Sequence, residues 1–234
     1  MNVTASELNP RSKSRARQTV VIILGLALFC VLFLLLDQAY YRFISARFPN
    51  AGASSWTASL FGLVSRAHVI VPLLLFVLWR PKPLGFQWGQ TRRHWRSLLV
   101  LLLLNGGVVA AYLWLTGSTT PYSDNPWFVT EVLTVPIVEE TMWRGLVLTA
   151  LLFTFGRLYT GRTAEHLAVW LSGLAFGFLH AGNALTGVPV AFVAVQVLNA
   201  AVWGVVYGYV RTGTESIYPP IFLHAAMNLV VVLA

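Results

Sequence analysis

Charged residues and cysteine are scarce in this chain of 234 residues. Only 10% of the residues are charged, whereas soluble proteins average about 25%, and Cys30 is the one cysteine. A single cysteine excludes a disulfide-stapled scaffold, and so few charges cannot cover a soluble core. Because 57% of the residues are hydrophobic and the mean hydropathy is +0.69, intrinsic disorder is excluded as well. The class that fits is a polytopic membrane protein built of helices.

Seven apolar runs follow a basic segment, 1–17, which we expect to be a cytoplasmic tail. It is not read as a signal peptide, because the apolar run after it is too long for one. Each run approaches the ~20 residues that cross the ~30 Å hydrocarbon core of a bilayer. The runs lie at 19–36, 60–79, 97–116, 128–155, 166–187, 188–210 and 216–234. The sequence therefore predicts an all-α transmembrane helix bundle of about seven spans, within a range of six to eight, as one domain over 18–234.

The basic residues are distributed unevenly between the two sides of the expected membrane. A net charge of +8 in a soluble protein would suggest nucleic-acid binding. Here the gaps on the amino-terminal side hold 12 Lys and Arg residues, and the opposite gaps hold only Arg42 and Arg47. The positive-inside rule then predicts a cytoplasmic amino terminus in a multi-pass protein of the cell (cytoplasmic) membrane. The expected partner of these charges is the lipid bilayer and not nucleic acid.

Two adjacent carboxylates stand near the middle of the fourth run, where an ionisable side chain costs roughly 2.5–3.5 kcal/mol of insertion free energy. Glu140 and Arg144 are four residues apart on one helix face and can pair, either as a structural ion pair or in a catalytic role. Glu139 points about 100° away and has no partner in its own helix, so it is free to act as a general base. Pro136, one turn earlier, loosens the helix beside the two carboxylates.

Two histidines lie at a similar depth on other runs. His180 is near the end of the fifth run, and His224 is in the seventh, four residues before Asn228. His224 and Asn228 share a helix face, and both side chains can donate hydrogen bonds to an anionic oxygen. At ~1.5 Å per residue, Glu139 and both histidines lie within roughly 6 Å of the bilayer midplane, so we expect one polar cavity to hold them. Arg66, in the second run, is expected to reach the membrane interface by snorkelling.

These residues fall into three motifs whose order and spacing resemble one family. Glu-Glu-x-x-x-Arg starts at Glu139, Phe-x-x-x-His ends at His180, and His-x-x-x-Asn starts at His224. The set is similar to the CPBP family, the CAAX prenyl protease and bacteriocin-processing intramembrane proteases, also known as Abi. The resemblance covers about 125–234, which we expect to be the catalytic-type core. It implies an enzyme, an intramembrane endopeptidase that uses a glutamate-activated water to hydrolyse a peptide bond of a membrane-associated protein or peptide.

The resemblance also implies a role for each site residue. Glu139 resembles the general base, and His180 resembles the residue that helps to hold the water. His224 and Asn228 resemble the donors to the oxyanion, and the neighbouring Glu–Arg pair of the first motif resembles a supporting pair. Metal-free chemistry without a cofactor is the expectation that follows. As an alternative, Glu139, His180 and His224 would form a zinc set with an open fourth position, although the chain has no His-Glu-x-x-His motif.

Two functions of other classes stay open at this point. In a proton-coupled transporter, Glu139 and the histidines would form a proton relay. That function predicts inverted repeats, and none is visible in the sequence. A non-catalytic membrane immunity or assembly factor is the second alternative.

Overall fold

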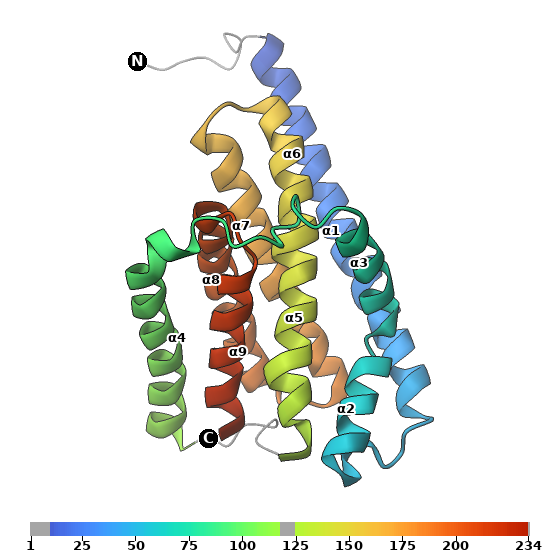
Figure 1. The fold of residues 1–234 in the computed structure, drawn as a ribbon. Coiled ribbons are helices and arrows are strands. Elements are labelled where there is room, and N and C mark those ends of the chain that lie inside the picture. The colour runs from blue at the N-terminus through green and yellow to red at the C-terminus, as the bar shows by residue number, and fades with distance from the viewer. Residues whose placement is uncertain (1–9, 118–124, 234) are drawn as a thin grey trace.

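The computed structural model describes residues 10–117 and 125–233, and this part of the chain consists of helices and turns without a strand. The predicted all-α class is therefore confirmed. In Figure 1 the helices stand beside one another as a bundle, with α1 at one edge and α4 at the opposite edge. The α-helices are α1 (Pro10–Ser45), α2 (Ser55–Val64), α3 (Ala67–Trp79), α4 (Trp95–Thr116), α5 (Val135–Glu140), α6 (Leu148–Leu158), α7 (Arg162–Leu179), α8 (Val190–Thr214) and α9 (Tyr218–Leu233).

The helix that carries the two adjacent glutamates contains two π-helical segments. Thr130–Thr134 comes directly before α5, and Thr141–Val147 links α5 to α6, so that 130–158 forms one rod. The backbone N–H of Val135 donates to the carbonyl five residues earlier, as π geometry requires. Pro136 lies in the first turn of α5 and lacks a backbone donor, which fits the loosening expected beside the carboxylates. π-helical segments are rare in proteins overall, and those that occur are often located at functional sites.

Four segments are long and apolar enough to cross a bilayer by length and composition. They are Lys13–Ser45, Thr91–Thr116, Arg162–Thr186 and Val190–Thr214. A fifth candidate is the pair α2 and α3, which bends by 67° at its break, so the run predicted at 60–79 is not one straight span. The rod 130–158 and the 16-residue α9 account for the other predicted runs. The structure thus supports four to five candidate spans, while seven spans and a cytoplasmic amino terminus stay predictions.

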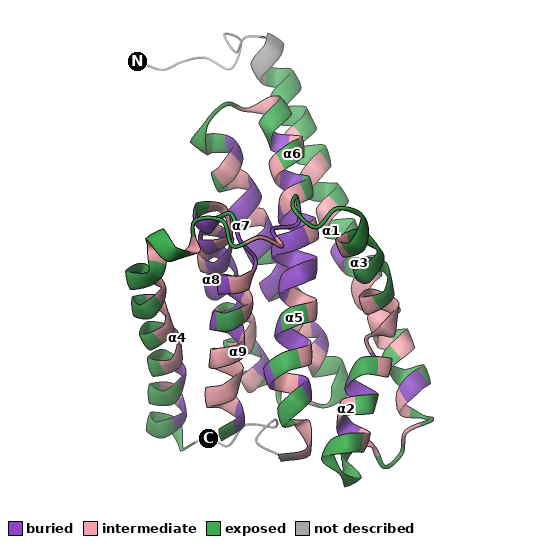
Figure 2. Cartoon of the chain, viewed as in Figure 1, coloured by how far each residue is buried: buried purple, intermediate pink, exposed green. Residues whose placement is uncertain are grey.

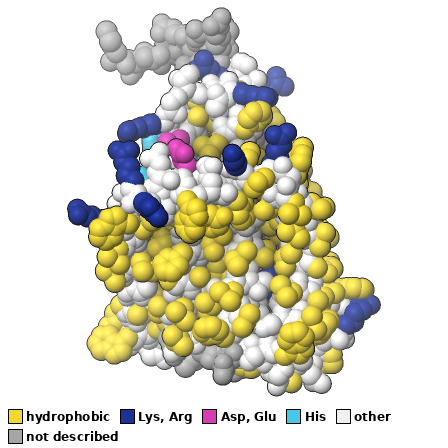
Figure 3. Space-filling model, viewed as in Figure 1, with side chains coloured by type: hydrophobic (Ala, Val, Ile, Leu, Met, Phe, Trp, Pro, Cys, Tyr) yellow, Lys and Arg dark blue, Asp and Glu magenta, His cyan; other side chains and the backbone are white. Residues whose placement is uncertain are grey.

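The surface of the described chain is that of a membrane protein. In Figure 2 the buried residues concentrate on the rod and on α7, α8 and α9, whereas α1 and α4 are largely exposed. In Figure 3 hydrophobic side chains cover a broad band of the visible face, and many Lys and Arg side chains gather at the end where α1 begins. Soluble monomers rarely expose apolar patches larger than a few hundred Å². A face of this extent is suited to contact with lipid.

Glycines allow α7 and α8 to approach closely. A Cβ on Gly173 would lie 2.5 Å from the backbone nitrogen of Val205, and a Cβ on Gly204 would lie 2.8 Å from the carbonyl oxygen of Gly173. Side chains at these positions would push the two backbones apart. The contact fixes the end of α7, from which His180 faces the site described next.

Candidate active site

A cavity of about 690 Å³ lies between α1, the α2–α3 break, α4, the rod, α8 and α9. Its volume is within the 300–1,000 Å³ that is usual for small-ligand sites. Four of the six site residues predicted from the sequence line this cavity: Glu139, His180, His224 and Asn228. The other two, Glu140 and Arg144, are fully buried and are not part of its lining. The structure therefore gathers the four expected side chains around one space.

Glu140 is the centre of a buried polar cluster. Its Oε2 is 3.1 Å from Nε of Arg144, which is the ion pair that the i, i+4 spacing predicts. Its Oε1 accepts a hydrogen bond from Nδ1 of His224 at 2.9 Å, and this histidine lies on α9, 84 residues later. Because an ionised carboxylate only accepts, the proton must be on Nδ1. Glu140 thus fixes the orientation of His224 and directs its Nε2 away from the cluster.

Arg144 is held by aromatic rings as well as by its carboxylate. Its guanidinium carbon lies 4.3 Å from the ring centroid of Phe176 and 5.5 Å from that of Tyr207. The terminal nitrogens make no hydrogen bond with the described residues, so contact with aromatic faces replaces hydration of the cation. Phe176 also packs edge-on against His180 and His224, at centroid distances of 4.8 and 6.1 Å. One phenylalanine therefore contacts residues of all three motifs.

Glu139 differs from its neighbour in its surroundings. Its side chain is 30% exposed, toward the cavity, whereas the side chain of Glu140 is 0% exposed. Oε2 of Glu139 lies 3.9 Å from Nε2 of His224, a histidine on another helix. That separation is too long for a hydrogen bond, and Oε2 makes none with the described residues. Of the two adjacent carboxylates, this one is available to bind water.

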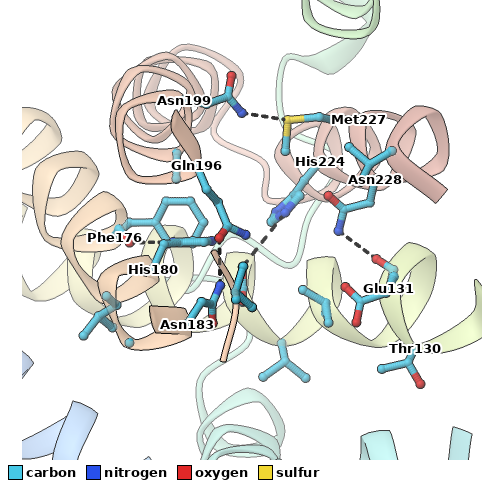
Figure 4. A pocket seen from close by; sticks show the side chains of 18 of the residues that line it. Thr130, Glu131, Phe176, His180, Asn183, Gln196, Asn199, His224, Met227 and Asn228 are labelled. Atoms are coloured by element: carbon cyan, nitrogen blue, oxygen red, sulfur yellow. Dashed lines mark hydrogen bonds and ion pairs between the residues drawn. The ribbon is translucent and has the colours of Figure 1, made fainter. Parts of the chain in front are cut away.

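His180 lies where α7 ends and faces the cavity. Its Nδ1 donates to the carbonyl oxygen of Phe176 at 3.0 Å, and Figure 4 shows this bond beside His224. A ring that donates from Nδ1 keeps Nε2 as an acceptor in its neutral form. His180 and Glu139 share the cavity without a direct contact among the described interactions. The arrangement leaves two acceptors on different helices for a molecule between them.

Asn228 and Glu131 meet at another wall of the cavity. The side-chain Nδ2 of Asn228 donates to the backbone oxygen of Glu131 at 2.8 Å (Figure 4). The amide has two hydrogens, so one is left for a further acceptor. Glu131 lies in the first π segment and also lines the cavity. We did not identify it from the sequence, although it is a third carboxylate within the same apolar run.

The α1–α3 side of the cavity carries further polar groups. Oδ1 of Asp37 on α1 lies 3.2 Å from Nε2 of His68 on α3. Arg66 also lines the cavity, and its Nη1 donates to the carbonyl oxygen of Gly62 at 3.3 Å. It stands at the break between α2 and α3, where the chain turns, and its reach to the membrane interface stays a prediction.

The alternative zinc set is not assembled in this structure. Within 10–117 and 125–233, no three His, Cys, Asp or Glu side chains are grouped so that they could hold a metal ion. Glu139 and His224 approach each other, but His180 contacts Phe176 instead of either of them in the described part of the chain. Among the described residues these three side chains are therefore not grouped as metal ligands, and metal-free chemistry stays a prediction.

Comparison with known proteins finds one family model that is similar to the second half of the chain. A family model described as "Type II CAAX prenyl endopeptidase Rce1-like" matches residues 121–230. Searches of curated proteins and of solved structures give no match. The matched stretch contains all six predicted site residues and nearly coincides with the 125–234 that the motifs indicate. Residues 121–230, just under half of the chain, are thus similar to the Rce1-like type II CAAX prenyl endopeptidases, in agreement with the resemblance that the three motifs indicate.

Proposed function

We propose that the protein is an intramembrane endopeptidase in which Glu139 activates the water that attacks a peptide bond. The observation that carries the proposal is the contrast between two adjacent carboxylates. Glu140 is buried and bonded to Arg144 and His224, whereas Glu139 is exposed to the cavity and makes no hydrogen bond with the described residues. The similarity of residues 121–230 to this family supports the reaction class. The family name also supports a membrane-associated substrate with a prenylated CAAX end.

In the first step, the attacking water donates one hydrogen to Glu139 and the other to Nε2 of His180. Two acceptors on different helices orient the water and leave one of its lone pairs for the substrate carbonyl carbon. As the new C–O bond forms, the proton passes to the carboxylate of Glu139, and the carbonyl π electrons move to the oxygen. Glu139 then holds the proton that the departing amine needs.

In the same step, His224 and Asn228 stabilise the oxyanion. Nε2 of His224 faces the cavity because Glu140 holds Nδ1. Donation from Nε2 requires the imidazolium form, in which the ring donates to Glu140 through one nitrogen and to the oxyanion through the other. The free N–H of Asn228 is the second donor. When the intermediate collapses, the C–N bond breaks, and Glu139 returns its proton to the leaving nitrogen.

We expect this chemistry to proceed without a metal ion, because the carboxylate and imidazole groups account for every proton transfer. The purified protein should contain no stoichiometric zinc by elemental mass spectrometry. Cleavage should be the same in 1,10-phenanthroline as in its non-chelating 1,7 isomer. One equivalent of bound zinc together with selective loss of activity in the chelator would replace this mechanism with a metal-dependent one.

Cleavage by the protein in lipid nanodiscs tests the proposal and the role of His224. The probe is a peptide whose prenylated cysteine lies three residues from a free carboxy terminus, with products identified by mass spectrometry. His224→Ala should lower kcat by about 10²–10³-fold with little change in KM, because an oxyanion donor acts mainly in the transition state. His166→Ala is the control, since His166 bonds Tyr209 outside the cavity and should leave kcat unchanged. A folded His224→Ala protein with wild-type kcat would contradict the assignment.

A further inference from the structure

Arg66 is the one Lys or Arg residue among the described residues that line the cavity. Most of the lining is apolar, and the other ionisable side chains in it are carboxylates, histidines and tyrosines. A charged group that faces a cavity within a membrane protein marks a path for substrates or ions. The proposed reaction gives Arg66 no role, since water activation, the oxyanion and the supporting ion pair use other residues.

The guanidinium of Arg66 has donors to spare. It makes one hydrogen bond, from Nη1 to the carbonyl oxygen of Gly62, and forms no ion pair in the described part of the chain. A guanidinium has five N–H donors in a planar fork that matches a carboxylate. Glu131 lies within its electrostatic reach, but no ion pair within 4.0 Å joins the two. Most N–H donors of Arg66 are therefore available to an anion that enters the cavity.

Contacts between α2 and the rod fix the position of Arg66 along the axis of the rod. Gly62, which accepts the bond from Arg66, packs against Thr130, since a Cβ on this glycine would lie 2.7 Å from Cγ2 of the threonine. Thr130 also donates to the carbonyl oxygen of Ala58 at 3.3 Å. Arg66 is thus anchored beside the Thr130–Glu131 end of the rod.

The general base lies farther along the same rod. Glu139 is eight residues after Glu131, which is roughly 12 Å along a helix axis at 1.5 Å per residue. An extended peptide of three residues spans about 10–11 Å at 3.3–3.6 Å per residue. The separation between the cation and the base therefore fits a chain end that extends a few residues beyond the bond to be cut. A cavity of about 690 Å³ also has room for the end of a peptide.

We infer that Arg66 binds the free carboxylate at the carboxy terminus of the substrate and so sets the distance from that end to the cleaved bond. This inference rests on the proposed function and adds a subsite to it. A guanidinium binds a lipid phosphate by the same hydrogen bonds as a carboxylate, so a lipid headgroup is the competing ligand. The peptide carboxylate is favoured because the subsite and the base line one cavity.

The test uses two probes that differ in one group: the prenylated peptide with a free carboxy terminus, and the same peptide ending in a carboxamide. Wild-type protein in nanodiscs of neutral lipid should bind and cleave the acid form with about 10- to 100-fold higher kcat/KM than the amide, because a charge-assisted bond is lost in the amide. Arg66→Gln should reduce that ratio to near one, mainly by lowering kcat/KM for the acid. Arg66→Lys should give an intermediate ratio, because it keeps the charge and loses the fork.

Controls separate this inference from the proposed function and from folding. Arg80→Gln, an exposed arginine outside the cavity, should keep the wild-type ratio. If Arg66→Gln does not fold, the acid-to-amide ratio of kcat/KM measured on Arg66→Lys tests the inference. The inference is overturned if wild-type protein shows no preference for the acid, or if neither Arg66 variant changes the ratio. It is also overturned if anionic lipid abolishes the preference, which would assign the fork to a lipid phosphate. Cleavage of both probes by Glu139→Gln at the wild-type rate would instead refute the proposed function, whatever the ratio.

Discussion

The Glu139→Gln protein should fold and bind substrate nearly as the wild type does, but cleave about 10²–10⁴-fold more slowly. Glutamine is nearly the same size and can still hydrogen bond, but its amide does not accept a proton at neutral pH. The side chain faces the cavity and has no hydrogen bond with the described residues, so the substitution breaks none. The measurements are the cleavage rate in nanodiscs and the melting temperature of the same preparation.

Glu165→Gln is a matched control, because Glu165 lies in the first turn of α7 outside the cavity. It should retain both the rate and the melting temperature of the wild type. A folded Glu139→Gln protein that cuts at the wild-type rate would end the mechanism proposed here. If that variant also kept full biological activity in cells, the non-catalytic membrane factor would become the better explanation.

Removal of either partner of the Glu140–Arg144 pair should cost about 3–5 kcal/mol of folding stability. Glu140→Gln leaves a buried guanidinium without its carboxylate, and Arg144→Ala leaves a buried carboxylate without its cation. Both side chains are no more than 1% exposed, so solvent cannot compensate either charge. The expected readout is a lower melting temperature and poorer expression, at least as marked as the loss of cleavage.

A double variant separates stability from positioning. Glu140→Leu combined with Arg144→Met removes both charges, and apolar replacement of a buried pair is often neutral for stability. Its melting temperature should recover, while its kcat should stay low because Nδ1 of His224 has lost its acceptor. A single variant that is well folded and wholly inactive would show instead that Glu140 or Arg144 takes part directly in the reaction.

Local patterns in the sequence were sufficient for much of the fold and for part of the site. Apolar runs predicted the helices, because crossing lipid demands a minimum length of uncharged residues. The Glu140–Arg144 pair followed from the helical repeat alone. In each of these cases, the partners are near in sequence or the pattern acts within one helix.

Local patterns do not predict features that depend on how helices far apart in the sequence face one another. The bond between Glu140 and His224 requires particular rotations of α5 and α9, and neither helix determines the rotation of the other. The break between α2 and α3 lies within an apolar run, and hydropathy reports composition and not direction. Arg66 and Glu131 therefore became visible as cavity residues only once that break and the rod were placed.

The hydrogen bond from Nδ1 of His224 to Glu140 also has an electrostatic consequence. With His224 as the imidazolium, the group of two glutamates, one arginine and one histidine has no net charge. When Glu139 takes a proton from water, the group gains one positive charge while one negative charge develops on the substrate oxygen. The sum stays zero from bound substrate to tetrahedral intermediate. Hydrolysis by this group would thus place no lone ion in a low-dielectric medium, where an uncompensated charge costs several kcal/mol.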